Sequence, residues 1–302
     1  MVPTNLQEAL AAGDKVIGYL TWFDCENAKI TPTDLKNLFT QYKLDDKYLP
    51  QSIKPKNAFQ KACRKAQTKN GASDDRRSVV KLIVDGMEKT IYGVVDLNVH
   101  QKQESISPDF SDKVWFEKSG WAVNYENGHP TCKAIKQLYN QLCGEYTTRD
   151  ISRMIVRAVD KLCSVQLRKA GIVYFVPAQM NNTLQALQAV VNSIGSCDMK
   201  VFAIGNGHGN SLGVEKEARS QINDKIASIK AEISDLRESI ESGTLKGQSA
   251  ENSLQVRVRR LKELKERCGI LSDALKMKAE GLMEEIENVS GLVKKELLSV
   301  AA

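Results

Sequence analysis

The hydrophobic pattern is most regular in the last third of the chain. From residue 222 to 240, apolar residues recur at alternating spacings of four and three, with charged residues between them. This 3.5-residue repeat is the pattern by which a helix buries one narrow seam against another helix. We therefore expect a coiled-coil helix that oligomerises through Ile222, Ile226, Ile229, Ile233, Leu236 and Ile240.

A second helical pattern follows from about residue 250 to 298. After Leu275 its apolar phase shifts as though four residues were inserted, which predicts a stutter in the supercoil. At about 1.5 Å per residue the first helix is about 40 Å long and the second stretch about 70 Å. Residues 278–298 therefore have no partner in a simple hairpin. Their own apolar stripe consists of Leu282, Ile286, Val289 and Val293.

This apolar stripe can be buried in three ways. It can fold back as a third helix, dock on the rest of the chain, or contact another chain, and Gly269 and Gly281 are places where the helix could break. We favour contact with another chain, because an exposed apolar stripe of this length is costly. The sequence therefore predicts a homo-oligomer that assembles through its C-terminal helices.

The front of the chain mixes helical and strand patterns. The first fifty residues are expected to form a small helical region, in which one helix starts at Pro32. Further helices are expected at 58–67, 131–142, 151–162 and 184–194. Strands are expected at 79–84, 91–99, 114–116, 121–125, 172–176 and 200–204. The first two strands predict a β-hairpin around Asp85-Gly86, and the last two a βαβ unit with parallel strands. The fold class is therefore α+β with a mixed sheet.

Four segments follow from these patterns. Residues 1–77 form the helical N-terminal region, which we expect to join the α+β domain of residues 78–205 as one unit. Residues 206–213 form a Gly-rich hinge, and residues 214–302 the coiled-coil helices.

The composition limits the cellular compartment in which we expect the protein. No apolar run reaches the ~20 residues needed to cross a bilayer, and the N-terminus does not resemble a signal peptide. Seven cysteines at irregular spacing do not indicate a disulfide framework, so we expect a cytoplasmic protein, with no membrane partner.

The net charge of +6 is concentrated in one segment. Residues 54–77 hold eight basic and two acidic residues, so the rest of the chain sums to zero. A second basic surface is expected on the helix at 151–162, where Arg or Lys recurs every fourth residue. These two surfaces indicate contacts with nucleic acid or an acidic partner, although a solvated helix face would look the same. The candidate nucleic-acid-binding residues are Lys54, Lys56, Lys61, Arg64, Lys65, Arg149, Arg153, Arg157 and Lys161.

Catalytic and cofactor motifs are incomplete. The loop at Gly205-Asn206-Gly207 is followed by Asn210 where a dinucleotide fingerprint requires glycine, and no Walker lysine follows. His129 and Cys132 lack the second ligand pair of a structural zinc site. His100, His129 and His208 are each more simply surface residues than general bases. We therefore expect no metal and no cofactor, and we assign no catalytic residue.

Two passages resemble a known family. Leu167 to Pro177 reads Leu-Arg-Lys-Ala-Gly-Ile-Val-Tyr-Phe-Val-Pro and resembles the Arg-x-x-Gly-Gly-Val-Tyr-Phe-Val-Pro signature of an uncharacterised family of phage- and plasmid-encoded proteins. Leu49-Pro50 with Ala58 to Ala62 is similar to that family's Leu-Pro…Ala-Phe-Arg-Arg-Ala segment. The resemblance covers residues 17–205, and the chain departs from it at Ala170 and Ile172. It implies a mobile genetic element as the setting and carries no activity.

These observations favour an oligomeric scaffold or interaction protein of a phage or plasmid that associates with nucleic acid. The alternative is an enzyme that processes nucleic acid or nucleotides, with a site assembled from residues that are distant in the sequence.

Overall fold

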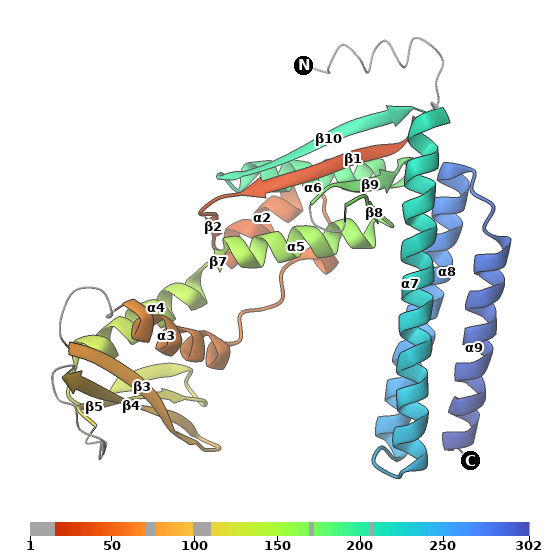
Figure 1. Ribbon diagram of the computed structural model, residues 1–302. Coiled ribbons are helices and arrows are strands. Elements are labelled where there is room, and N and C mark those ends of the chain that lie inside the picture. The colour runs from red at the N-terminus through yellow and green to blue at the C-terminus, as the bar shows by residue number, and fades with distance from the viewer. Residues whose placement is uncertain (1–15, 70–75, 99–109, 169–171, 206–207, 302) are drawn as a thin grey trace. The chain divides into compact units, whose positions relative to one another are not determined.

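The computed structural model describes residues 16–69, 76–98, 110–168, 172–205 and 208–301 (Figure 1). These residues form two compact units, and the chain passes between them more than once. The first unit comprises residues of 1–25, 41–44 and 155–302, and the second comprises residues of 26–40 and 45–154. Both ends of the chain therefore contribute to the first unit, a division that differs from the boundaries expected at 77 and 205.

The first unit combines a sheet with the C-terminal helices. Its elements are β1 (Val16–Cys25), the end of α5 (Thr148–Lys161), β8 (Val165–Gln166), β9 (Tyr174–Pro177), η2 (Ala178–Met180), α6 (Asn181–Ser193), β10 (Cys197–Gly205), α7 (His208–Glu241), α8 (Gly247–Leu275) and α9 (Glu280–Ala301).

The sheet of the first unit has the order β10-β1-β9-β8, and every adjacent pair is antiparallel. β1 lies inside the sheet, so the expectation of a helical region over the first fifty residues is wrong for residues 16–25. Their β-branched and aromatic side chains suit a buried strand, and Ile17, Thr21 and Phe23 are buried. β1 also passes close to β9, where a Cβ on Gly18 would lie 2.4 Å from the ring of Phe175.

β9, α6 and β10 correspond to the predicted βαβ unit, with one correction. Both strands are antiparallel to β1 and so run in the same direction, but β1 separates them. The mixed sheet expected from the sequence is therefore absent among the described residues, which form antiparallel sheets. α6 buries Leu184, Leu187, Val190 and Val191, and its Gln188 side chain donates to the carbonyl of Met199 in β10.

The C-terminal region consists of three helices that run side by side (Figure 1). α8 ends at Leu275, where Lys276 adopts the left-handed conformation (φ 52°), and α9 begins at Glu280. The phase shift after Leu275 is therefore a helix break and not a stutter. A left-handed residue directly after a helix satisfies its last carbonyl groups, here through the bond from Lys276 N–H to Ser272 O.

The apolar stripes of these helices bury one another within a single chain. Ile222, Ile226, Ile229 and Ile233 of α7 are buried in one cluster with Leu282, Ile286, Val289 and Val293 of α9, and Leu236 and Ile240 pack against it. For residues 278–298 the structure shows the third helix, α9, which buries its apolar stripe within the chain. Assembly of several chains remains a prediction, but the burial of these residues does not require it.

The helical region also packs on the sheet of its own unit. Ile17 and Phe175 belong to the same buried cluster as α7 and α8. α7 begins at His208, so residues 208–213 form the first turns of a helix and not a hinge, while residues 206 and 207 lie outside the described residues.

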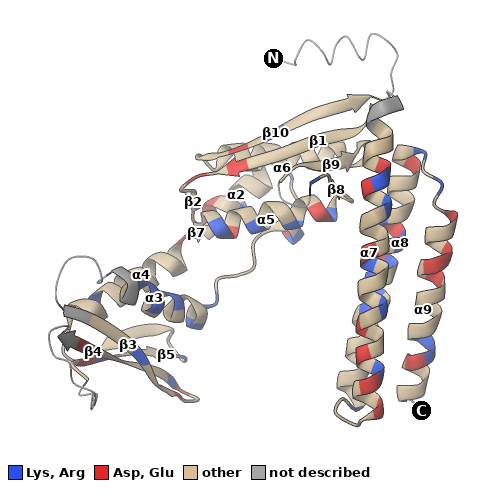
Figure 2. Ribbon diagram, in the orientation of Figure 1, with Lys and Arg blue, Asp and Glu red and all other residues tan. Residues whose placement is uncertain are grey.

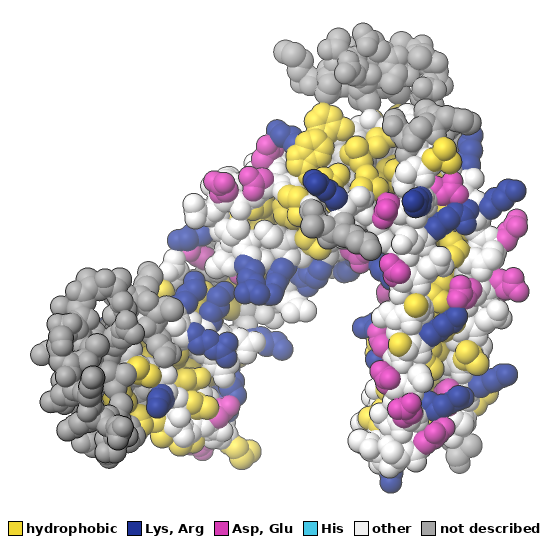
Figure 3. Space-filling model, viewed as in Figure 1, with side chains coloured by type: hydrophobic (Ala, Val, Ile, Leu, Met, Phe, Trp, Pro, Cys, Tyr) yellow, Lys and Arg dark blue, Asp and Glu magenta, His cyan; other side chains and the backbone are white. Residues whose placement is uncertain are grey.

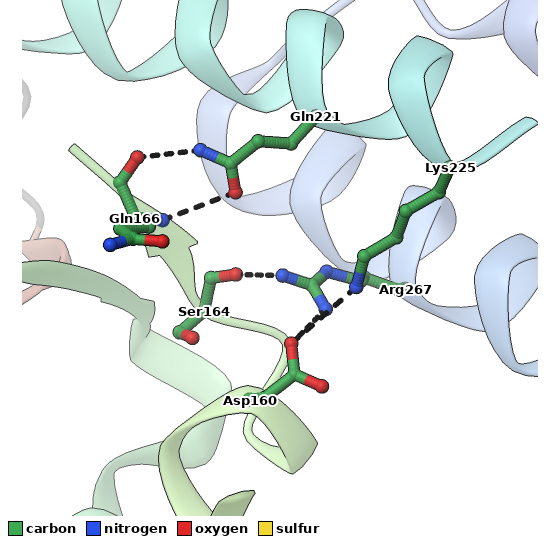
Figure 4. Close-up of polar contacts among 6 residues, drawn as sticks. All are labelled: Asp160, Ser164, Gln166, Gln221, Lys225 and Arg267. Atoms are coloured by element: carbon green, nitrogen blue, oxygen red, sulfur yellow. Dashed lines mark hydrogen bonds and ion pairs between the residues drawn. The ribbon is translucent and has the colours of Figure 1, made fainter. Parts of the chain in front are cut away.

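Polar contacts fix the end of α5 and β8 to the helices (Figure 4). Arg267 of α8 pairs with Asp160 at 2.7 Å and donates to the carbonyl of Ser164, and Lys225 of α7 lies 3.5 Å from the same carboxylate. Gln221 of α7 exchanges two hydrogen bonds with the backbone of Gln166. These bonds specify the register between the helices and the sheet, which apolar contact alone does not.

The second unit is built on a separate antiparallel sheet. Its elements are β2 (Lys29–Ile30), α2 (Pro32–Gln41), η1 (Asp46–Tyr48), α3 (Pro55–Lys69), β3 (Arg76–Asp85), β4 (Lys89–Asn98), β5 (Asp112–Glu117), β6 (Ala122–Tyr125), α4 (Pro130–Gly144), β7 (Tyr146–Thr147) and the start of α5. The predicted hairpin is confirmed as β3 and β4, which continue into the order β3-β4-β5-β6. β2 and β7 form a two-stranded antiparallel sheet.

Within the described part of the chain, no helix is both long enough and apolar enough to cross a membrane.

Candidate nucleic-acid interface

α3 and α4 lie against the four-stranded sheet of the second unit and against each other. α3 turns one face to the sheet, where Phe59 stacks on Phe116 at 5.6 Å and meets the Tyr92 ring edge-on at 5.6 Å. α4 contributes Ile135 and Tyr139 to the same core. The apolar residues of both helices are used in this packing, so their outer faces are polar. We call these two outer faces the basic helical layer.

The basic helical layer carries charge of one sign. The sequences of α3 and α4 contain seven Lys or Arg residues and no Asp or Glu. Figure 2 shows both helices without acidic residues, and Figure 3 shows Lys and Arg side chains gathered over the helices of this unit on the face viewed. Neither helix contributes a carboxylate, so compensation for this charge comes only from other elements, and a surface that is largely of one sign attracts polyanions.

The structure brings together most of the predicted residues of the first basic segment. Lys54, Arg64 and Lys65 are exposed and Lys61 is half-buried. Lys56 is already engaged, because its Nζ lies 2.7 Å from Oδ2 of Asp85. Hydrogen bonds from Lys56 and Thr90 lower the pKa of Asp85 to about 2, so the carboxylate remains ionised and keeps Lys56 paired.

The two members of the layer that lie on α4 were not predicted from the sequence. Lys133 and Lys136 lie on α4, where Lys133 is exposed and Lys136 lies over the ring of Tyr125 at 5.7 Å. They are 70 residues from the α3 cluster and too few to form a charge run. The signal in the sequence was the absence of any acidic residue from α4. It points to a basic surface only once α4 is known to pack beside α3.

The residues of the second predicted surface lie on one face of α5, but this face is divided between the units. Arg149, Arg153, Arg157 and Lys161 are exposed, while the opposite face buries Ile151, Met154, Ile155, Ala158, Val159 and Leu162. Arg149 and Arg153 belong to the second unit, and Arg157 and Lys161 to the first. Arg153, Arg157 and Lys161 have interaction partners within the chain, as do Arg64 and Lys65 of the basic helical layer. The α5 stripe is a weaker candidate than the basic helical layer because its residues are divided between the two units.

A polar cluster beside α4 contains the residue types of a catalytic site. His129 Nε2 lies 3.0 Å from Asp96 Oδ2, and Ser78 Oγ donates to Asp96 Oδ1 at 2.7 Å. However, His129 Nδ1 accepts the backbone N–H of Thr131 and so caps α4. Both ring nitrogens are engaged, so the imidazole would have to release one of these bonds before it could take a proton from a substrate.

The carboxylates of this cluster support the loop before α4. Asp112 is buried and accepts the backbone N–H groups of Lys113, Asn127 and His129. Burial raises the pKa of Asp112, but the hydrogen bonds from these backbone donors lower it by more, so the pKa lies below its ordinary value. Burial likewise opposes ionisation of Asp96, and Ser78 and His129 more than offset this, leaving its pKa lowered. Both carboxylates therefore act as acceptors that order the loop.

Cys132, considered with His129 for zinc, faces the core. Burial and the neighbouring Asp112 raise its pKa to about 12, which disfavours the thiolate that a metal requires. Over the residues that the structure describes, no three His, Cys, Asp or Glu side chains are grouped closely enough to hold a metal ion. His100 lies outside the described residues.

These features define a two-unit α+β protein with a C-terminal helical region and a basic helical layer on its second unit. The chain belongs to a family of unknown function (DUF6744), whose sequence profile matches residues 16–302. The match includes α7, α8 and α9 and so covers the C-terminal helical region as well as the sheets of both units. No curated protein and no solved structure matches the chain.

Proposed function

We propose that this protein is an interaction protein that binds the phosphate backbone of nucleic acid through the basic helical layer. The observation that carries the proposal is the pairing of two helices that hold seven basic residues and no acidic one. Lys and Arg that neutralise phosphates release condensed counterions, and this supplies most of the sequence-independent affinity of a protein for nucleic acid.

The chemistry of the layer favours backbone contacts over base recognition. The aromatic residues of α3 and α4 are Phe59 and Tyr139, and both are buried. They are therefore not available to stack on bases, which is how proteins commonly bind single strands. The proposed ligand is accordingly a duplex bound with little sequence preference. The resemblance to phage- and plasmid-encoded proteins supports a role on a mobile genetic element.

Fluorescence anisotropy with a labelled DNA duplex tests this proposal. The test variant replaces Arg64, Lys65 and Lys133 by Gln, and the matched control replaces the exposed Lys262, Lys294 and Lys295 of the first unit by Gln. Both variants lose three positive charges, but only the test variant loses them from the basic helical layer.

The salt dependence supplies the magnitude. Each phosphate contact contributes about 0.9 to the slope of log affinity against log salt, so three lost contacts reduce the slope by about 2.7. Between about 50 and 200 mM salt the wild type should then lose ~40-fold more affinity than the test variant. The proposal is refuted if wild-type binding is absent or insensitive to salt, or if the control variant loses as much as the test variant.

A nucleic-acid-processing enzyme is the second candidate, and the contact between His129 and Asp96 is the observation that favours it. Incubation of the protein with labelled DNA and RNA, with and without divalent cations, would detect such an activity. Turnover that is abolished by His129→Asn, a change that retains a capping side chain, would establish the enzyme reading. Turnover unaffected by this change, or no turnover, would remove His129 from consideration.

A further inference from the structure

Cys25 and Cys197 face each other across two strands of the first unit. β1 ends at Cys25 and β10 begins at Cys197, and the two residues are direct partners in the antiparallel register. Directly opposed residues in such a pair have Cα atoms about 4.5–5.5 Å apart, which lies within the range that a disulfide bridges. Both cysteines are reduced in the structure.

The two thiols also interact. A hydrogen bond from Cys25 lowers the pKa of Cys197, against the opposing effects of burial and of Asp24. The other five thiols differ, since burial raises the pKa of each: Cys63, Cys132, Cys143, Cys163 and Cys268. Thiolate character decides which cysteine reacts, so Cys197, with Cys25 directly opposite, is set apart from the rest.

We propose that Cys25 and Cys197 form a reversible disulfide when the protein meets a small disulfide oxidant such as glutathione disulfide. The half-exposed Cys25 and the buried Cys197 suit two different roles in this reaction. Cys25 is the more exposed of the two, so an external reagent reaches it first, and Cys197 is its direct partner on β10.

The exchange proceeds in two balanced steps. Exposure assigns the first attack to Cys25: its thiol gives up its proton, its sulfur attacks one sulfur of glutathione disulfide to form a mixed disulfide, and the glutathione released takes up that proton. The Cys197 thiolate then attacks the Cys25 sulfur, breaks its bond to glutathione and releases the second glutathione. Glutathione disulfide takes the two electrons, and the two protons of the protein thiols end on the two glutathione molecules.

The bond would join β1 to β10 where the chain leaves the first unit, because Glu26 already belongs to the second unit. Oxidation would therefore hold the end of β1 in its sheet. The expected result is a higher Tm for the oxidised protein, which returns to the reduced value after treatment with dithiothreitol.

Peptide mapping of the full-length protein tests the proposal. The protein is equilibrated in glutathione buffers of increasing oxidising strength, quenched by alkylation and digested. We expect one cross-linked pair of peptides that contain Cys25 and Cys197, lost on reduction, with the buried Cys63 and Cys132 remaining alkylatable only after unfolding. In the Cys197→Ser variant we expect the mixed disulfide on Cys25 to accumulate, because no resolving thiol is present.

Two results would overturn the proposal. One is a wild-type protein in which glutathione stays attached to Cys25 and no Cys25–Cys197 peptide forms. The other is a cross-link that forms between different cysteines. Circular dichroism of the Cys197→Ser variant verifies that it is folded, and the wild-type mapping decides the matter even if it is not.

Discussion

Substitution of Ile286 by Ala distinguishes burial within one chain from burial between chains. Ile286 lies on α9 and is 1% exposed, in the cluster shared with α7 and α8. The change removes three carbon atoms at about 0.8 kcal/mol each, and the cavity left behind adds to this loss. We expect the free energy of unfolding of the first unit to fall by about 3 kcal/mol. For a unit of this size that corresponds to a decrease in Tm of about 6–12 °C.

The assay must report on the first unit alone. Of the three tryptophans, only Trp22 lies in the first unit, where it stacks on Phe202 with ring centroids 5.0 Å apart. Fluorescence in a Trp115→Phe, Trp121→Phe background therefore follows the unfolding of this unit. Leu292→Ala on the same helix is the control, because that side chain is 50% exposed and should change stability by less than about 0.5 kcal/mol.

Protein concentration separates the two outcomes. If α9 packs within its own chain, the unfolding midpoint should be unchanged over a hundredfold dilution, and light scattering should show that Ile286→Ala does not alter the molar mass. If α9 instead pairs between chains, the same dilution should lower the apparent stability by about 2.8 kcal/mol. A midpoint that moves with concentration, or a molar mass that falls in the variant, would refute the intramolecular arrangement.

Three further substitutions test other parts of the structure. Asp160→Asn removes the partner of Arg267, and urea denaturation should show a loss of about 1 kcal/mol in the free energy of unfolding at pH 7. Because the pKa of the half-exposed Asp160 is lowered in the folded state, this loss should shrink as the pH falls below about 4, and a difference that stays constant with pH would contradict the ion pair. Gly18→Ala places a Cβ 2.4 Å from the buried ring of Phe175, so thermal unfolding should reveal a loss of about 2 kcal/mol or more, and an unchanged Tm would disprove the close approach. His129→Ala removes the cap of α4 and should cost about 1 kcal/mol, which His129→Asn should largely restore; equal losses in both would argue against capping.

Local pattern was sufficient for elements whose partners are close in the sequence. The hairpin of β3 and β4 follows from two apolar runs around Asp85-Gly86, and α4 and α6 follow from their helical spacing. The α+β class and the helical C-terminal region are confirmed for the same reason. Periodicity predicts which face of a helix or strand is buried, and a short connection indicates that the neighbouring element in the sequence covers that face.

The failures share one cause, which is that periodicity does not identify a distant partner. β1 pairs with β9 and β10, which follow it by about 150 residues or more, so nothing next to residues 16–25 indicated a sheet. The stripe of α9 has the same spacing whether another chain or α7 and α8 cover it. The break at Lys276 is set by one left-handed residue that is not glycine, and Gly269 and Gly281 remain helical.

The candidate interface was predicted in part. The α3 cluster is visible as a charge run, because five of its basic residues fall within 15 positions. Lys133 and Lys136 of α4 join it only through the packing of the two helices on one sheet. Conversely, the regular spacing of Arg149 to Lys161 suggested one continuous surface, although the chain divides that helix between two units.

The interrupted path of the first unit determines the order in which the protein can fold during synthesis. β1 leaves the ribosome well before its two neighbouring strands, which lie beyond residue 170, so it has no sheet to join until they have been made. The second unit lies almost entirely between these segments and can form its core earlier. Until β9 and β10 emerge, β1 is an unpaired apolar segment that is open to chaperones and to self-association, so the slowest and most error-prone step of folding should be the closing of this sheet.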